Sequence, residues 1–288
     1  MGLAAGSEPV SAPVRSDRIE RPLAVMRIAL SAAVIAAAVV PLYLLAKQAL
    51  TPELETFAWP PSWLPRDLTL RNFAAVFAVG ELRGAIVRSL CVGAISAAGA
   101  TVLGAMLAYA MARGGAAQRV GFAAVSGVRL LPMIAVAIPA GIMLASLGLY
   151  DTPGALGLAV IHCAIAIPTA ALTLYAAFAA VPREIEEAAW LDGASPVRVF
   201  FAIDLPIVRG ALSAAFVLCF ILSWDEFGFA LLLQQTNRTL PPLLYYYTVF
   251  GNVGPASALA LLMMIPAVCV VIALGPAMRT AMVTGSSR

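Results

Sequence analysis

Few side chains in this sequence could carry out chemistry, and they are not arranged as a catalytic or metal site. A single histidine, His162, and a single lysine, Lys47, stand far apart in the 288-residue chain. Lys47 does not follow the glycines of a GxxxxGK[ST] loop, in which a lysine reaches nucleotide phosphates. The four cysteines lie in apolar segments without CxxC spacing: Cys91, Cys163, Cys219 and Cys269. We therefore expect no enzymatic activity, no metal and no cofactor in this chain alone.

One pair of carboxylates, Asp225 and Glu226, follows Trp224 within an otherwise apolar run. Carboxylates inside a membrane are costly and usually face a pathway or a partner. A transported cation would be attracted by both charges, whereas a sugar would use them as hydrogen-bond acceptors beside the indole ring. Alternatively, the pair lies between two membrane subunits or near the outer surface. Trp224, Asp225 and Glu226 are therefore candidates for a substrate path.

A second charged segment interrupts the apolar sequence between residues 182 and 209. Eight of its 28 residues are charged, whereas the whole chain has 18 basic and 15 acidic residues. Inserting so many charges into a bilayer would cost on the order of tens of kcal/mol. The segment must therefore lie outside the membrane.

The residues of this segment predict two short helices separated by a turn. Pro182 suits a first helical position, and Gly193 suits a left-handed C-terminal cap. Ser195 before a proline is typical of the start of a second helix, which Pro206 would end. Spacing of i, i+3 and i+4 gives this second helix one apolar face: Val197, Phe200 and Phe201. Such a face either folds back onto the ends of the membrane spans or docks on another protein.

The composition identifies an all-α integral membrane protein. Hydrophobic residues make up 62% of the chain and charged residues 11%, whereas soluble domains carry about 25% charged residues. One span needs about 20 helical residues. Six apolar runs meet this length, near residues 23–46, 87–112, 120–147, 156–180, 210–233 and 256–276. The third could instead cover 129–147, because Arg129 in mid-membrane would cost about 2.5–3.5 kcal/mol.

The basic residues predict the orientation of these spans. One side of the membrane would carry eleven of them and the other side six, and the positive-inside rule places the richer side in the cytoplasm. We expect cytoplasmic tails at residues 1–22 and 281–288 around a six-helix domain at residues 23–280. Within that domain, loop 47–86 is external and loop 182–209 is cytoplasmic. The net charge of +3 is scattered, which argues against a nucleic-acid partner.

Fixed spacings connect seven residues of the cytoplasmic loop: Glu187, Ala188, Ala189, Gly193, Ile203, Leu205 and Pro206. This pattern resembles the EAA loop of permease subunits in binding-protein-dependent ABC importers. The segments WLPRDLTLRNFAAVF, LGAMLAYAMAR and SWDEFGFALLL are similar to the carbohydrate branch of that family, the maltose-type permeases. Asp225 stands where that branch usually has asparagine, and an acidic residue also occurs there in permeases of the spermidine–putrescine type. The resemblance implies a sugar substrate, with a polyamine as the alternative.

In that family the loop forms a coupling helix that sits in a cleft of a cytoplasmic ATPase subunit. The resemblance implies that Glu187, Ala188, Ala189 and Gly193 form the core of this contact. With Asp192, Val197 and Phe200, they make up the seven expected ATPase-coupling residues. It also implies a bacterial inner-membrane complex with a second homologous permease, two ATPase subunits that bind ATP and Mg, and an extracytoplasmic substrate-binding protein. A secondary transporter is the rival class. It would need coupling-ion ligands and usually inverted repeats, and no clear repeat is present.

Overall fold

The chain folds into helices joined by loops, and the longest of the described loops covers residues 57–70. The computed structural model describes residues 17–78 and 80–285. Side chains are described between residues 25 and 273, with the exception of residues 79, 133 and 134. The side chain of residue 275 is described as well. The parts of the expected tails at 1–16 and 286–288 lie outside the described residues. Four described helices are long and apolar enough to cross a membrane: α1 (Asp17–Leu50), α4 (Glu81–Ala112), α7 (Leu156–Ala179) and α14 (Val253–Gly285).

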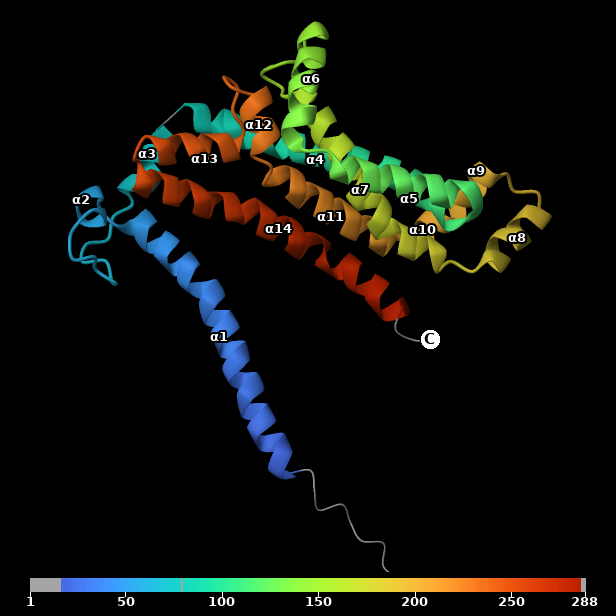
Figure 1. Ribbon diagram of the computed structural model, residues 1–288, viewed down its shortest axis with the longest axis horizontal. Helices are drawn as coiled ribbons and strands as arrows, with labels where there is room; N and C mark the ends of the chain where they lie inside the picture. Colours follow the sequence, from blue (N-terminus) through green and yellow to red (C-terminus); the bar gives the residue numbers. More distant parts are fainter. Residues whose placement is uncertain (1–16, 79, 286–288) are drawn as a thin grey trace, which may run out of the picture.

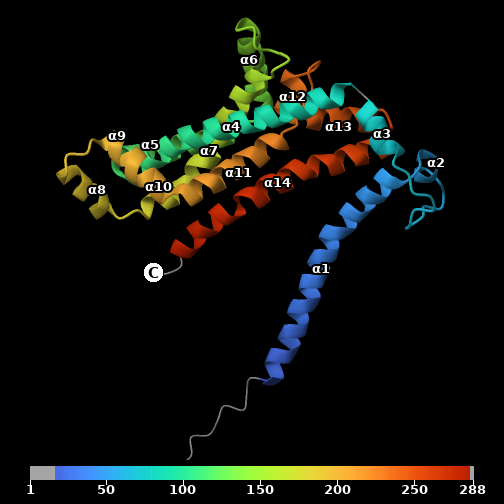
Figure 2. The ribbon, with the colours of Figure 1, turned by 180° about the vertical axis from the view of Figure 1, so that it is seen from behind.

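Three of these helices form a bundle with α11 (Arg209–Trp224). Figures 1 and 2 show α4, α7, α11 and α14 running side by side, with α2 (Glu53–Thr56) and α3 (Arg71–Ala78) at one end. A buried apolar cluster joins α4, α7, α11 and α14. The expected second span, 87–112, therefore starts earlier, because α4 begins at Glu81.

Helix α4 packs closely against α7 along a stripe of small residues. Its buried positions include Ser96, Ala97, Ala100, Gly104 and Ala108. A Cβ atom at Gly104 would lie 2.5 Å from Cβ of Ala170 in α7. Small residues at helix contacts are typical of membrane bundles, where backbones gain from close approach.

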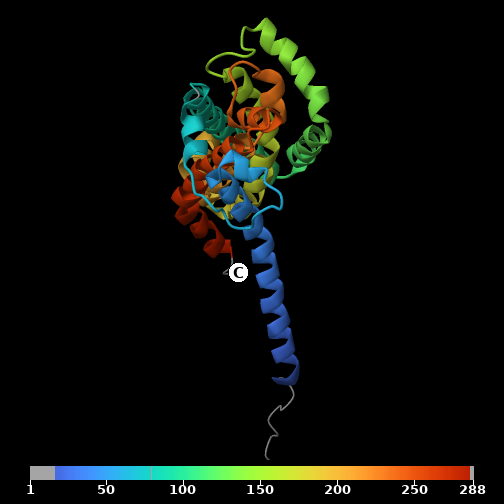
Figure 3. The same cartoon turned by 90° about the vertical axis from the view of Figure 1, so that its left-hand side faces the viewer.

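Helix α1 leaves the bundle at an angle, as Figures 1 and 3 show. Its apolar side chains are exposed along most of its length, including Ile28 at 70% and Leu30 at 66%. Only near its C-terminal end does it pack against the rest of the chain, where Ala49 is buried. The Asn72 side-chain amide in α3 contacts this end of α1. It donates hydrogen bonds to the carbonyls of Ala49 at 3.0 Å and Thr51 at 2.9 Å.

The expected third span is bent in the structure, and neither 120–147 nor 129–147 is a single helix. Helix α5 (Gly115–Leu130) and helix α6 (Met133–Ser146) meet at 94°, and Figure 3 shows the resulting arch. Pro132 causes the break. It cannot donate a helical hydrogen bond, and it favours an extended conformation at the preceding residue, which Leu131 adopts with ψ of 124°. Arg129 lies before this bend, and its guanidinium donates to Thr169 Oγ1 at 2.9 Å.

The expected fifth span, 210–233, is also interrupted. Helix α11 ends at Trp224, and the short helix α12 (Gly228–Leu233) begins after a three-residue break. Helix α13 (Leu240–Val249) then leads into α14. The break therefore falls on the two carboxylates that the sequence placed inside a span.

Candidate coupling loop and substrate path

The loop between α7 and α11 projects beyond one end of the bundle, opposite α2 and α3 (Figures 1 and 2). It contains α8 (Arg183–Leu191), α9 (Pro196–Val199), a π-helical turn η1 (Phe200–Asp204) and α10 (Leu205–Ile207). Gly193 has a φ of 82°, the left-handed conformation expected for a helix cap. Ser195 caps α9, because its side chain accepts a hydrogen bond from Arg198 N at 3.3 Å. The local signals of the sequence thus match this turn.

Six of the seven expected ATPase-coupling residues are exposed or half-buried on the projecting loop, and we call these six together the coupling surface. Five of them are exposed and one is half-buried: Glu187, Ala188, Asp192, Gly193 and Val197, with Ala189 the half-buried one. Around them lie exposed apolar side chains, such as Leu191 at 90% and Trp190 at 46%. An apolar patch at the end of a membrane bundle indicates a protein contact.

Phe200 does not lie on this surface. Its side chain is 8% exposed and packs inside the chain against Tyr109 of α4 and Phe178 of α7, with ring centroids 5.0 Å and 6.1 Å away. Phe201 is 61% exposed instead. The apolar face expected from Val197, Phe200 and Phe201 is therefore divided, because the π-helical turn changes the direction of successive side chains. Part of the segment folds back onto the bundle and part remains free.

Two buried carboxylates of the loop were missed by the sequence analysis. Glu186 and Asp204 are 1% and 0% exposed, and both face the guanidinium of Arg113 at the end of α4. Burial raises the pKa of the Asp204 carboxyl above its usual value, while the Arg113 charge and a hydrogen bond from Tyr109 oppose that rise. Glu186 is adjacent to Glu187, and no sequence signal distinguishes the inward glutamate from the outward one.

Trp224 packs in the core of the described chain. Its side chain is 4% exposed and stacks on Phe220, with ring centroids 5.7 Å apart. Its indole Nε1 donates to the backbone carbonyl of Met263 in α14 at 3.0 Å. This hydrogen bond therefore joins α11 to α14.

The Glu226 side chain caps the N-terminal end of helix α12. Its carboxylate accepts hydrogen bonds from the backbone N–H groups of Phe229 at 2.9 Å and Ala230 at 3.1 Å. His162 of α7 lies between the same carboxylate, 3.1 Å from Nε2, and Ser223 Oγ, 2.8 Å from Nδ1. A neutral imidazole satisfies both contacts when Nε2–H donates and Nδ1 accepts. The network therefore connects α7, α11 and α12 across the break.

We expect Glu226→Ala to destabilise the chain by about 2–4 kcal/mol. It removes a helix cap, which contributes about 1 kcal/mol, and leaves the buried imidazole N–H without an acceptor, which costs about 1–3 kcal/mol. Asp225→Ala is the matched control, because the adjacent Asp225 is exposed. Thermal unfolding of both variants in detergent measures the difference. Equal losses for the two would show that the network adds nothing.

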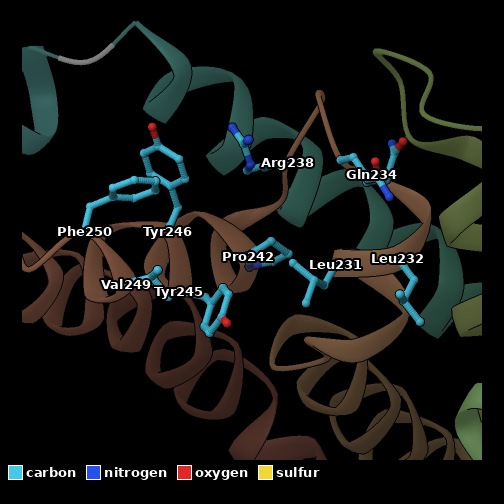
Figure 4. A pocket seen from close by; sticks show the side chains of 10 residues that line it. Leu231, Leu232, Gln234, Arg238, Pro242, Tyr245, Tyr246, Val249 and Phe250 are labelled. Atoms are coloured by element: carbon cyan, nitrogen blue, oxygen red, sulfur yellow. The ribbon is translucent and has the colours of Figure 1, made fainter.

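An open pocket of about 350 Å³ lies beside α12 and α13. Figure 4 shows its aromatic and polar lining, which includes Arg238, Tyr245, Tyr246 and Phe250. The Arg238 guanidinium lies 4.9 Å from the centre of the Tyr246 ring and 3.2 Å from a Glu81 oxygen. No motif marks this pocket in the sequence, although all its lining residues lie between residues 231 and 250.

The whole chain is similar in fold to a solved transporter. One chain of a bacterial ABC transporter involved in the import of the acidic polysaccharide alginate superposes with a TM-score of 0.73, at 17% sequence identity, over 92% of this chain and 99% of that chain. This similarity shows that the bundle has the fold of an ABC importer permease.

Two curated relatives are also named as permease proteins. The trehalose transport system permease protein SugB of Mycobacterium tuberculosis is 32% identical over 62% of this chain and 64% of that protein. The inner membrane ABC transporter permease protein YcjP of Escherichia coli is 31% identical over 65% of this chain and 68% of that protein.

The long apolar helices, the interrupted spans and the projecting loop thus define a multi-pass membrane permease. The chain belongs to the family of binding-protein-dependent transport system inner membrane components, whose family model matches residues 100–276. This range includes the loop between α7 and α11, the break before α12 and most of the bundle. The family is one of transporter permeases, not of enzymes, and its members belong to the inner membrane.

Proposed function

We propose that this chain is the permease subunit of an ATP-driven sugar importer. It would form half of a translocation pore with a second homologous permease, and a substrate-binding protein would deliver the sugar. Two cytoplasmic ATPase subunits would bind ATP and Mg, and one of them would contact the coupling surface. The observation that carries this proposal is the exposed coupling surface, which projects from the bundle on a loop whose buried Glu186 and Asp204 face Arg113 of the bundle.

The assignment of a sugar is supported by the relatives. SugB is the permease protein of a trehalose transport system, and the solved transporter is involved in the import of the polysaccharide alginate. A polyamine site would need free negative charges, but the Glu226 carboxylate is already occupied by two backbone N–H groups and His162. Asp225 alone remains exposed. We therefore keep Asp225 as a residue of the substrate path, where it would accept hydrogen bonds from sugar hydroxyls.

The orientation follows from the same proposal. If the coupling surface meets the ATPases, the ends of α4 and α7 that carry Arg113 and Phe178 lie on the cytoplasmic side. Both termini would then be cytoplasmic, and the α2–α3 end would face the binding protein. The rival secondary transporter would need no partner ATPase.

Gly193→Val tests the coupling. Valine is strained at a φ of 82°, so the turn that presents the coupling surface would change shape. With the permease pair, the ATPases and the binding protein in liposomes, we expect ATP-dependent sugar uptake to fall about tenfold, the change that corresponds to losing about 1.4 kcal/mol of a coupling free energy that is typically about 1–3 kcal/mol. Glu187→Ala, on the same surface, should reduce uptake as well.

Gly251→Val is the matched control. Gly251 has a φ of 76° and open space around its Cα, so the substitution introduces similar strain near the opposite end of the bundle. We expect this variant to lose far less uptake than Gly193→Val. Equal losses would point to general strain, and uptake that persists without any ATPase would favour a secondary transporter.

A further inference from the structure

A buried cluster of three charges lies where the projecting loop meets the bundle. The Arg113 side chain is 20% exposed, whereas the Glu186 and Asp204 side chains are 1% and 0% exposed. The Nη2 atom of Arg113 forms an ion pair with Glu186 and lies 3.6 Å from Asp204 Oδ1. One guanidinium therefore faces a carboxylate from α8 and another from η1.

Arg113 also contacts the ends of two membrane helices. It follows the last residue of α4, and its guanidinium carbon lies 4.7 Å from the centre of the Tyr109 ring in that helix. Its Nη1 atom donates to the carbonyl of Phe178 in α7 at 3.2 Å. Its own carbonyl accepts a hydrogen bond from Arg183 Nη2 in α8 at 3.0 Å. A single residue thus connects α4, α7, α8 and η1.

Such a cluster is a costly way to hold segments together. Moving charges out of water is unfavourable, and apolar residues of similar size often give equal or greater stability. A planar guanidinium between two carboxylates is directional, however, and restricts the relative orientation of the groups. The cluster therefore restricts the position of α8 against the ends of α4 and α7.

The two adjacent glutamates of α8 point in different directions. Glu186 faces inwards to Arg113, and Glu187 is exposed on the coupling surface. A displacement of α8 at the coupling surface would therefore reach Glu186 through the next residue of the same helix, and the ends of α4 and α7 through Arg113. Asp204 connects the second half of the loop, before α10, to the same guanidinium.

We propose that Arg113 is the positioning residue of the coupling loop, and that its contacts with Glu186, Asp204 and Phe178 make the loop and the ends of α4 and α7 move as one body. This inference rests on the proposed function, in which an ATPase moves the coupling surface. Arg113 itself lies behind that surface and acts through the loop. Without it, movement of the loop would no longer be transmitted to the spans.

The test compares Arg113→Gln, Arg113→Lys and the control Arg119→Gln in the assembled transporter. Arg119 is exposed and forms no ion pair with the residues that the structure describes. We expect Arg113→Gln to retain ATP hydrolysis but to lower the sugar transported per ATP by about fivefold or more, comparable with the smaller of the roughly 5–150-fold effects that one site typically has on affinity at another. Lysine restores the positive charge but not the planar guanidinium group. Arg113→Lys should therefore recover part of the sugar transported per ATP. The control should behave as the wild type.

A second variant separates positioning from folding. Arg113→Gln alone leaves two buried carboxylates uncompensated, whereas the triple variant Arg113→Gln, Glu186→Gln, Asp204→Asn has no unpaired buried charge. We expect the triple variant to assemble like the wild type and still show the lowered transport ratio. A wild-type ratio in the triple variant would overturn the proposal.

Hydrogen exchange on the full-length chain in detergent provides a readout that does not require transport. We expect faster exchange across residues 183–207 in Arg113→Gln and in the triple variant than in Arg119→Gln, because the loop has lost its anchor. Unchanged exchange would overturn the role of Arg113. Failure of the wild-type complex to use ATP for uptake, with the exchange difference present, would contradict the proposed function instead.

Discussion

Replacing Gly104 with leucine is expected to separate α4 from α7 and to destabilise the permease by about 3 kcal/mol or more, because overpacking a tight contact cannot be relieved by a rotamer change. The position leaves no room for a side chain. A Cβ atom there would lie 2.5 Å from Ala170 Cβ and 3.0 Å from the backbone nitrogen of Ala171. The backbone of α7 cannot give way without moving the whole helix. Thermal unfolding in detergent and the yield of assembled complex both measure this loss.

Gly127→Leu is the matched control in α5. Nothing lies within 4 Å of the Cβ position there, and leucine favours helix more than glycine by roughly 1 kcal/mol. We expect this variant to be as stable as the wild type or slightly more stable. An alanine at Gly104 should give a smaller loss than leucine. A Gly104→Leu variant with wild-type stability would contradict the close helix contact.

The sequence predicted the apolar runs but not where they bend. Length and hydropathy identified every stretch that contributes a long helix. Prolines did not mark the breaks reliably, because Pro139 and Pro168 remain inside α6 and α7, while Pro132 separates two helices at 94°. Membrane helices tolerate proline when neighbours satisfy the freed carbonyls. The outcome therefore depends on tertiary packing that a single sequence does not contain.

Local signals of the projecting loop were visible in the sequence, and long-range contacts were not. Gly193 and Ser195 act on their immediate neighbours, so their types predicted the turn correctly. The ion pair between Arg113 and Glu186 connects residues from different helices, and the sequence had assigned Arg113 only to the count of cytoplasmic charges. Phe200 was placed on an exposed face because a regular helix was assumed, whereas the π-helical turn directs it inwards.

Trp224 shows how a residue type can suggest the wrong environment. An indole beside two carboxylates is a reasonable sugar contact, yet this side chain is 4% exposed. We expect Trp224→Ala to cost about 3–5 kcal/mol, the usual range for removing a buried tryptophan, because it leaves a cavity beside Phe220 and removes the hydrogen bond to the Met263 carbonyl. Trp63→Ala is the control, since Trp63 is 76% exposed, and thermal unfolding gives the comparison.

Trp224→Phe distinguishes packing from substrate binding. Phenylalanine keeps a ring against Phe220 but removes the N–H that bonds to the Met263 carbonyl. That carbonyl keeps its partner within helix α14, so we expect a loss of only about 0.5–1.5 kcal/mol, the net contribution of one hydrogen bond. A packing role predicts fewer folded molecules with an unchanged KM for sugar uptake by the folded fraction, because a buried indole does not touch the sugar. If Trp224 contacted the sugar, KM would rise in this variant even where folding is normal. The exposed Asp225, by contrast, should change KM with little effect on stability, and this opposite pattern at adjacent residues separates the core of α11 from the path beside it.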